Sequence, residues 1–291
     1  MAADLFRSDS NFRELVVHAS ERVGVDLEHL CLRGPDRELV RTKHLQPLMV
    51  CVSLGYLRHL TMGGMKPDIV LGHSLGEITA LAAAGVVSFK TAVDIAAKRG
   101  EFMDAAATRL KGGMVAVISP ERDAILRFLT DNILPEKLVL ANDNAPDQIV
   151  LSGEQEGLDQ AARFITRAKL GRCRRLPVAG PWHSPAMEQA RREFEAWLGP
   201  VDFRAPQVSM LFNVTAATET DPGKIRQLVA WNLVKPVRWR SCMGQLRAVG
   251  TTALFEIGPG RVLSGLARAN GIGDETHVCN VNNLQGVELA A

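Results

Sequence analysis

Apolar residues recur along this chain in two patterns, short continuous runs typical of buried strands and longer segments with helical spacing. Residues 69–71 (Ile-Val-Leu) form one of the short runs. They lead directly into Gly-His-Ser-Leu-Gly at residues 72–76, and an alanine-rich segment continues to Gly85. This order predicts a strand, a sharp turn and a helix.

The predicted turn is the first candidate for chemistry. We expect its apex residue, Ser74, to expose its hydroxyl beside a helix N-terminus, whose free N–H groups favour an oxyanion. We expect Gly72 and Gly76 to let the strand and the helix approach each other without Cβ clashes. A Gly-x-Ser-x-Gly pattern also arises by chance, but the strand before it and the helix after it favour a nucleophilic serine.

Strands and helices alternate on both sides of this motif. The apolar spacing predicts helices over residues 8–24, 45–60, 88–107, 187–198, 225–233 and 240–248, a helix opening at 258–260, and strands over 208–212 and 253–257. Pro47 fits the first turn of the second of these helices. The alternation predicts an α/β fold with a parallel sheet.

The pattern changes between residues 113 and 180. Strands are predicted over 114–118, 138–141, 148–151 and 174–178, and helices over 121–131 and 154–168. Their order is strand, helix, strand, strand, helix, strand, which is typical of a ferredoxin-like fold. We therefore expect a large α/β domain of residues 1–112 and 181–291 that carries an inserted ferredoxin-like subdomain of residues 113–180.

Charge and cysteine content exclude several classes of protein. The formal net charge is +2 and aromatic residues do not interleave with basic ones, so nothing indicates a nucleic-acid partner. The five cysteines are scattered without close spacing, which favours free thiols in a reducing compartment over disulfides or a metal site. The sequence shows no signal-peptide pattern and no apolar run of about 18 residues, and we expect a cytoplasmic protein without a membrane partner.

A nucleophilic serine needs a base, and His183 is the best candidate among the histidines. It lies in a turn-rich segment, residues 179–185, where the predicted insert returns to the large domain. Clefts between domains commonly hold functional sites. His73 adjoins Ser74 in sequence, but neighbouring side chains at such a turn usually point apart. The alternative for His183 is a structural histidine in a loop.

Arg99 shares one face of the predicted 88–107 helix with Ala92, Ala96 and Met103. A guanidinium on an otherwise apolar face needs an anion to offset its desolvation. That anion is either a glutamate in a structural salt bridge or a substrate carboxylate held bidentately, and the spacing does not choose between them. No dinucleotide fingerprint, P-loop or metal-ligand spacing is present, so no cofactor is indicated.

A basic run follows in the predicted subdomain. It contains no acidic residue and comprises Arg163, Arg167, Lys169, Arg172, Arg174 and Arg175. It is either a solvated face or a docking surface for an acidic partner.

Together these motifs resemble the malonyl-CoA:acyl carrier protein acyltransferase (transacylase) family. The matching segments follow the family's order over nearly the whole chain: Gly-His-Ser-Leu-Gly-Glu at 72–77, Lys-Arg-Gly at 98–100, Gly-Gly-Met at 112–114, residues 142–153, His-Ser-Pro-Ala-Met at 183–187, Phe-Asn-Val-Thr at 212–215, Asn232 with Pro-Val-Arg-Trp at 236–239, and Glu-Ile-Gly-Pro-Gly at 256–260. The resemblance implies a large α/β hydrolase-like domain with a ferredoxin-like insert, in agreement with the pattern above.

The resemblance also implies a catalytic role for each of four residues. Ser74 would be the acyl-accepting nucleophile and His183 its base. The main chain of Asn232 would orient the histidine, which gives a dyad without a third acid. Leu75 would supply one oxyanion N–H, and it matches the form of the motif found in malonyl-type members.

The implied substrate-binding residues are Arg99, Met114, Asn142, Trp182 and Gln46. Arg99 matches the arginine that binds the malonyl carboxylate, while Met114 and Asn142 match pocket-lining positions and Gln46 matches a Gln-Pro near the site. Family members commonly carry a smaller or phenylalanine-like residue in place of Trp182, and we expect the indole to narrow the acyl pocket.

One departure concerns the oxyanion hole. The family opens with a strand and a Gly-Gln-Gly-Ser loop that provides a second donor, and this chain begins just after the place of that segment. Loss of one such donor typically costs about 2.7 to 4 kcal/mol of transition-state stabilisation. We expect either a start that is truncated relative to the working protein or another group in the donor's place.

The resemblance implies an enzyme that moves a malonyl group from malonyl-CoA to the phosphopantetheine thiol of an acyl carrier protein through a malonyl-serine intermediate. Fatty-acid and polyketide biosynthesis both use this step. Malonyl-CoA would be the substrate, the phosphopantetheinylated carrier protein the partner, and no cofactor is expected. The alternatives are a malonate decarboxylase transacylase subunit, a serine thioesterase or esterase, and a catalytically impaired homologue that lacks the N-terminal oxyanion loop.

Overall fold

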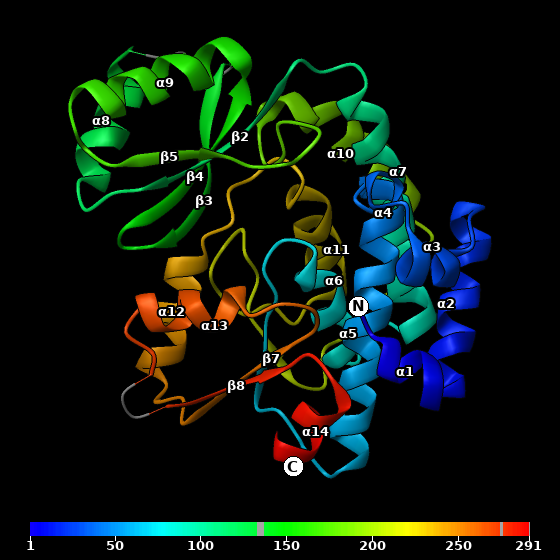
Figure 1. The fold of residues 1–291 in the computed structure, drawn as a ribbon. Helices are drawn as coiled ribbons and strands as arrows, with labels where there is room; N and C mark the ends of the chain where they lie inside the picture. Colours follow the sequence, from blue (N-terminus) through cyan, green and yellow to red (C-terminus); the bar gives the residue numbers. More distant parts are fainter. Residues whose placement is uncertain (133–136, 274–275, 291) are drawn as a thin grey trace.

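The computed structural model describes residues 1–132, 137–273 and 276–290. Figure 1 shows a group of long helices on one side, short strands in the middle, and a separate four-stranded sheet with its own two helices. The predicted α/β class is confirmed by this mixture and by the similarity to solved structures described below.

The helical side begins at the N-terminus with α1 (Ala3–Ser8), α2 (Ser10–Val23), α3 (Leu27–Arg33), α4 (Asp36–Leu39) and α5 (Thr42–Met62). Asp9 caps α2, because its side chain accepts the N–H of Phe12 at 3.0 Å. Helix α5 starts three residues before the apolar spacing indicated, so Pro47 lies inside the helix. Our placement of Pro47 in the first turn is therefore wrong, since the apolar pattern does not show where the polar start of a helix falls.

The middle of the molecule holds two pairs of parallel strands. Strand β1 (Ile69–Val70) pairs with β6 (Ser209–Met210), and β7 (Ala253–Ile257) pairs with β8 (His277–Val281). Within the described residues these pairs are not hydrogen-bonded to each other. A cavity of about 600 Å³ lies between them, lined by β1, β7 and one face of α5. The predicted parallel sheet is therefore present as two separate halves.

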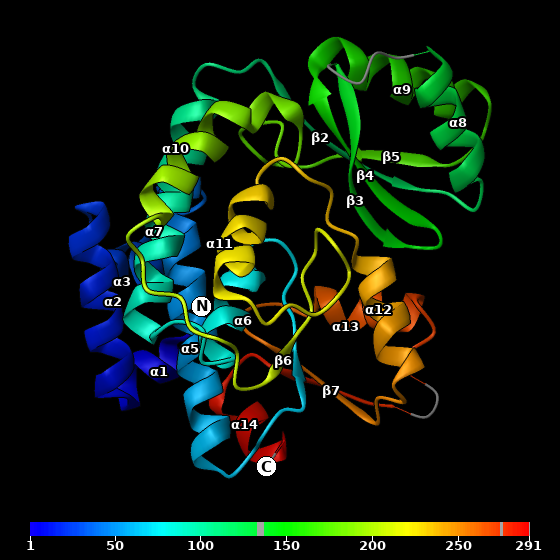
Figure 2. The ribbon, with the colours of Figure 1, turned by 180° about the vertical axis from the view of Figure 1, so that it is seen from behind.

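Two helices follow β1 and pack against α5. They are α6 (Gly76–Ala83) and α7 (Phe89–Ala107), which Ser88 caps by accepting the N–H of Thr91 at 3.0 Å. The main hydrophobic core lies between α5, α6, α7 and α2. These helices lie side by side in both of the opposite views in Figures 1 and 2. This core fixes the end of β1 and the middle of α7 relative to each other.

The four-stranded sheet has the strand order β3-β4-β2-β5 and is antiparallel throughout. Its elements are β2 (Gly112–Ile118), α8 (Arg122–Asn132), β3 (Leu138–Ala145), β4 (Gln148–Glu154), α9 (Gln155–Arg167) and β5 (Arg172–Arg175). Their order is the predicted one, although β5 begins and ends earlier than residues 174–178. Helices α8 and α9 cover one face of the sheet and close a second, smaller core around Ile125, Leu158 and Ile165.

After β5 the chain leaves the four-stranded sheet and returns to the rest of the molecule. It forms a 3-10 turn (Pro185–Met187), α10 (Glu188–Leu198), α11 (Pro222–Trp231), α12 (Trp239–Ala248), α13 (Val262–Ala269) and α14 (Leu284–Ala290). Strand β3 joins this part through a bridge between Asn142 and Val237, in which the Val237 N–H donates to Ala141 O at 2.8 Å. The segment of residues 181–187 packs on the main core through Trp182 and Met187. In the described parts of the chain, no helix has the length and apolar character needed to span a bilayer.

Candidate active site

Ser74 lies at the apex of the turn between β1 and α6, as predicted. Its φ of 51° is in the left-handed region, which is uncommon for a residue with a side chain. The Ser74 Oγ lies 2.8 Å from His183 Nε2 and also accepts a hydrogen bond of 3.2 Å from Arg99 Nη2. The turn thus presents the hydroxyl to a base and to a cation at once.

The two glycines of the turn have different roles. A Cβ on Gly72 would lie 2.0 Å from the main-chain carbon of Gly76, so the strand and the helix approach too closely there for any side chain. A Cβ on Gly76 would meet nothing within 4 Å. The expectation that both glycines relieve clashes is wrong for Gly76, because a Cβ built there would point into open space.

His183 is held in place by the segment that follows α11. Its Nδ1 lies 2.6 Å from the main-chain oxygen of Asn232, so Nδ1 carries the proton and Nε2 is free to accept one from Ser74. His183 has a φ of 57° and its N–H donates to Leu233 O. The neighbouring His73 instead lies 2.8 Å from Asn144 Oδ1, pointing away from Ser74.

Arg99 lies in the middle of α7 and is 1% exposed. Its guanidinium donates to Gln46 Oε1 at 2.9 Å, to Asn232 Oδ1 at 3.0 Å and to Ser74 Oγ. These acceptors are all neutral, and no carboxylate of the described chain lies within 4 Å of it. Within the described residues its Nε is buried without a hydrogen-bond partner. The guanidinium therefore has spare capacity for an anion.

Burial shifts the pKa values of the charged groups around Ser74. It lowers the pKa of His183 to about 3, and the charge of Arg99 and the ring of His73 add to the effect. Burial also lowers the pKa of Arg99 to about 10, opposed by the charge of Glu77. His183 is accordingly a neutral imidazole at neutral pH, which is the form that accepts a proton.

The main-chain N–H of Leu75 is available at the start of α6. The N–H groups of the next three residues, 76 to 78, donate to the main-chain oxygens of residues 73 to 75 in the same order. The Leu75 N–H has no acceptor in the described chain. An unpaired N–H directly after a nucleophile is a suitable oxyanion donor.

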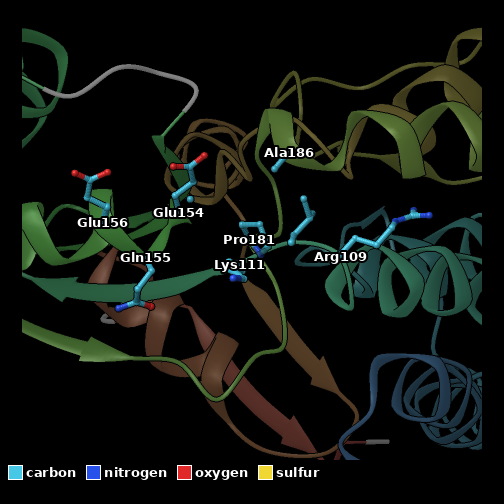
Figure 3. A pocket seen from close by; sticks show the side chains of 9 residues that line it. Arg109, Lys111, Glu154, Gln155, Glu156, Pro181 and Ala186 are labelled. Atoms are coloured by element: carbon cyan, nitrogen blue, oxygen red, sulfur yellow. The ribbon is translucent and has the colours of Figure 1, made fainter.

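A pocket of about 420 Å³ opens beside the segment that carries His183. Pro181 and Ala186 line it from that segment, and Arg109 and Lys111 line it from the turn between α7 and β2, although the side chain of Arg109 points away from Pro181 in Figure 3. The remaining wall comes from the end of β4 and the start of α9, where Glu154, Gln155 and Glu156 stand. Basic and acidic residues therefore both line this opening.

The other predicted substrate-binding residues are buried near the two cores. Met114 lies on β2 with its main-chain oxygen accepting the N–H of Leu176, and Asn142 lies on β3 in the bridge to Val237. Trp182 packs its indole over Gly180. Among the described residues, none of these three side chains hydrogen-bonds Ser74, His183 or Arg99, and their roles in an acyl pocket stay predictions.

Sequence reasoning gave no role to two residues at the centre of this geometry, Asn213 and Glu77. Asn213 is fully buried, and its Oδ1 accepts the N–H of Ser74 at 2.7 Å. Glu77 is 1% exposed and accepts the N–H of Asn213 at 2.7 Å. The sequence could have identified Asn213 as a site residue, because it directly follows a predicted strand. The carboxyl ends of neighbouring parallel strands meet at one edge of a sheet, which is where Ser74 also lies.

The basic run lies on α9, on β5 and in the turn between them, where all six side chains are exposed. Arg175 pairs with Asp159 at 2.7 Å. The choice between a solvated face and a docking surface is not decided by this placement. No group of three or more histidine, cysteine, aspartate or glutamate side chains is placed to hold a metal ion in residues 1–132, 137–273 and 276–290.

Comparison with known proteins gives consistent matches over the whole chain. The model of the acyl transferase domain matches residues 1–279. A protein of Bacillus subtilis (strain 168), named malonyl CoA-acyl carrier protein transacylase, is 35% identical over 292 residues, which span 100% of this chain and 91% of that protein.

Solved structures are similar over the same length. The acyl carrier protein S-malonyltransferase of Vibrio cholerae O1 biovar eltor str. N16961 has a TM-score of 0.92 and 34% identity, covering 99% of this chain and 94% of the other. A malonyl-transacylase bound to its type II PKS acyl-carrier protein has a TM-score of 0.92 and 31% identity, covering 99% and 93%.

Proposed function

This chain belongs to the acyl transferase domain family, and on that basis we propose that it moves a malonyl group from malonyl-CoA to the phosphopantetheine thiol of an acyl carrier protein. The observation that carries the proposal is the placement of Arg99 beside the nucleophile. A buried guanidinium whose partners are all neutral lies 3.2 Å from Ser74 Oγ, where the acyl group of an ester would be attached. That position suits an acyl chain that ends in a carboxylate.

The first half of the reaction uses Ser74, His183 and Leu75. The Ser74 hydroxyl gives its proton to His183 Nε2 as Oγ attacks the thioester carbon of malonyl-CoA. The negative oxygen of the tetrahedral intermediate forms beside the Leu75 N–H and the N-terminus of α6. When the carbon–sulfur bond breaks, the CoA sulfur takes the proton from His183, and a malonyl ester remains on Ser74.

The second half reverses these steps with another thiol. His183 takes the proton of the phosphopantetheine thiol, whose sulfur attacks the ester carbon. The Ser74 oxygen leaves and regains the proton from His183. The main-chain oxygen of Asn232 stabilises the charged imidazole in both halves, since it accepts the Nδ1 proton. No acid of the kind found in a Ser-His-Asp triad is needed for this role.

Arg99 selects the acyl group. A malonyl carboxylate offers two oxygens to the guanidinium, whereas an acetyl group leaves the buried charge with its neutral partners only. A site built to pair with a polar group rejects analogues that lack it, because its own groups then stay unpaired. We propose that Gln46 and Asn232 keep the guanidinium pointed at the acyl position.

The pocket between Lys111 and Pro181 is our proposed entrance for the thioester arm of either substrate. It borders the His183 segment on both sides of the histidine.

No cofactor enters the proposed reaction, because Ser74 carries the acyl group between the two thiols. We propose a cytoplasmic location, which suits the five cysteines, all free in the described chain. The reaction serves fatty-acid or polyketide synthesis, as in the transacylases that this chain resembles.

The intact mass of the protein after brief mixing with malonyl-CoA tests this function. We expect a gain of one malonyl group that is absent in Ser74→Ala, together with release of one equivalent of CoA. Addition of a phosphopantetheinylated carrier protein should then remove the adduct and place the malonyl group on the carrier.

Two rival functions give different outcomes in the same experiment. A serine thioesterase predicts that the adduct is lost to water at the same rate with or without the carrier protein. A catalytically impaired homologue predicts that malonyl-CoA binds but that neither adduct nor free CoA appears. Either result would overturn the proposed transfer.

A further inference from the structure

A buried hydrogen-bond network, formed by Glu77, Asn213 and Asn232, underlies the groups around Ser74. The side-chain amide of Asn213 spans the turn, because its Oδ1 accepts the Ser74 N–H at 2.7 Å and its Nδ2 donates to Gly72 O at 2.7 Å. Asn213 itself is 0% exposed. This one side chain therefore fixes both the first residue and the apex of the turn that presents the nucleophile.

Glu77 connects the turn to the rest of the site from the first turn of α6. Its Oε2 accepts the main-chain N–H of Asn213 at 2.7 Å, and its Oε1 accepts a longer bond of 3.3 Å from Asn232 Nδ2. Within the described chain no basic side chain lies within 4 Å of this carboxylate. Both hydrogen-bond partners of Glu77 are thus asparagines that also bond to other residues of the site.

Asn232 holds the remaining two groups of the site. Its main-chain oxygen accepts the Nδ1 proton of His183 at 2.6 Å, and its Oδ1 accepts a hydrogen bond of 3.0 Å from Arg99 Nη2. Glu77 therefore links Asn213, which bonds the Ser74 main chain, to Asn232, which bonds both His183 and Arg99. Neither Glu77 nor Asn213 directs a side-chain atom at the Ser74 or His183 side chains.

The backbone of the site requires such a support. Ser74 and His183 both have left-handed φ values, 51° and 57°. A residue with a side chain held in this region costs on the order of 1–3 kcal/mol, and the conformation persists only where the surroundings determine it. The Asn213 amide acts directly on the main chain of Ser74, at the strained residue itself.

We propose that Glu77 and Asn213 are positioning residues for the acyl transfer, holding Ser74, His183 and Arg99 at their reacting distances through the network with Asn232. The inference rests on the proposed function, because it explains how that site is held. A shift of about 1 Å between a nucleophile and its base can lower a rate on the order of 10²-fold. Loss of the network should therefore lower the rate of acylation more than the binding of substrate.

Glu77→Gln is the sharpest variant. A glutamine has one acceptor, and if that oxygen serves the Asn213 N–H, the new NH₂ group faces the NH₂ group of Asn232. A flip of the Asn232 amide would relieve this contact but would aim its NH₂ group at Arg99. The substitution keeps the size of the side chain and breaks the network at either Asn232 or Arg99.

Glu256 offers a matched control. It is also a buried glutamate, and it accepts the N–H groups of Leu263 and Ser264 at 2.9 and 2.7 Å at the start of α13. Glu256→Gln should lower thermal stability without changing the acylation rate constant. Comparison of the two glutamines separates loss of a buried acceptor from loss of position at Ser74.

The experiment measures single-turnover acylation of the full chain with malonyl-CoA and with acetyl-CoA. We expect Glu77→Gln and Asn213→Ala to lower the acylation rate constant on the order of 10²-fold for both thioesters, with the KM for malonyl-CoA changed less than about threefold. Asn213→Asp, which keeps the acceptor for Ser74 but loses the donor to Gly72, should recover part of the rate. If either of the first two variants does not fold, Asn213→Asp carries the test against the wild type.

A rate constant within about threefold of the wild type in the folded variants would overturn the inference, as would a raised KM with an unchanged rate constant. A wild type that forms no adduct contradicts the proposed function instead. The two failures are therefore distinct, because the first requires an acylated wild type.

Discussion

The pairing of Arg99 distinguishes this site at the scale of single residues. A buried guanidinium is costly unless its donors are satisfied. Here three neutral oxygens accept from it, while its Nε has no partner in the part of the chain that the structure describes. Sequence spacing left a salt bridge to a glutamate open. The nearest buried glutamate, Glu77, instead accepts from Asn213 and Asn232.

Arg99→Ala should reduce the preference of the enzyme for malonyl-CoA over acetyl-CoA. We expect the kcat/KM for malonyl-CoA to fall on the order of 10²- to 10³-fold, because the substrate carboxylate then enters a buried site without its cation. The kcat/KM for acetyl-CoA should change much less. Steady-state transfer with both thioesters measures this, and an equal loss for both would contradict a carboxylate-binding role.

The low pKa of His183 predicts an unusual pH dependence. The neutral imidazole is the active form, so a lower pKa keeps the base active to lower pH. An ordinary histidine with a pKa of about 6.5 would be mostly protonated at pH 5 and acylation would fall about 30-fold there.

Between pH 8 and pH 5 we expect the kcat/KM for acylation to show no loss centred near pH 6.5, whereas a loss centred near pH 8 would belong to Glu77, because burial raises the pKa of its carboxyl to about 8. Stopped-flow release of CoA across this range measures it, with the circular dichroism signal followed in parallel to show that the fold persists. An acid limb centred near pH 6.5 would show that His183 titrates normally in the free enzyme.

At the scale of elements, the contact between β1 and α6 determines the shape of the nucleophile turn. Gly72 lies against the main chain of Gly76 and Glu77, and its carbonyl accepts from the side chain of Asn213. The helix can start at this point only because the strand has no side chain there. The Leu75 N–H is consequently left free at the site of the oxyanion.

The substitutions Gly72→Ala and Gly76→Ala should therefore differ sharply. The first places a Cβ about 2.0 Å from main-chain carbon, and we expect a loss of about 3 kcal/mol or more in the free energy of unfolding. The second adds a methyl group in open space within a helix, and it should be neutral or stabilising by up to about 1 kcal/mol. Denaturant unfolding of the two variants gives the comparison, and equal stabilities would contradict the close approach.

At the scale of the whole molecule, two of the three hydrophobic cores of the described chain meet near the site, and the third lies around Trp239, Met243 and Leu266. One of the two lies among the long helices and the other between the four-stranded sheet and α8 and α9. The opposite face of that sheet packs on the first core through Met114, Ala141 and Val150. Residues 109–111 and 181–186 lie where the chain enters and leaves the four-stranded sheet, and the pocket that Pro181 and Ala186 line opens there.

We propose that residues 113–180 behave as one cooperative unit, as the sequence-based boundaries suggest. Ile165→Ala removes a fully buried side chain of the smaller core and should destabilise that unit by about 2–5 kcal/mol. Hydrogen exchange should then show faster exchange of the amides of β2 to β5, α8 and α9 together, with α5 and α7 unchanged. Equal acceleration in α5 and α7 would show a single unit.

Much of the fold followed from local patterns. The apolar run before Ser74 and the spacing of the 88–107 helix identified elements that the structure contains, because burial of one face leaves a period in the sequence. Element ends were less predictable: α5 begins at Thr42 and β6 has only two residues, since polar caps and hydrogen-bonded partners decide where an element stops. The short helices α1, α3 and α4 were not predicted, because few residues define their pattern.

The amino-acid sequence alone specifies the chemistry available to this protein. Ser74, His183 and Arg99 are the residue types that acyl transfer to a serine and recognition of a carboxylate require, and the local turn motif is enough to mark Ser74. How these residues act together depends on the folded chain. The hydrogen bonds from Ser74 to Asn213 and from Arg99 to Asn232 each join positions more than 130 residues apart. Such contacts have no local period in the sequence, because they arise where two cores and the ends of parallel strands meet.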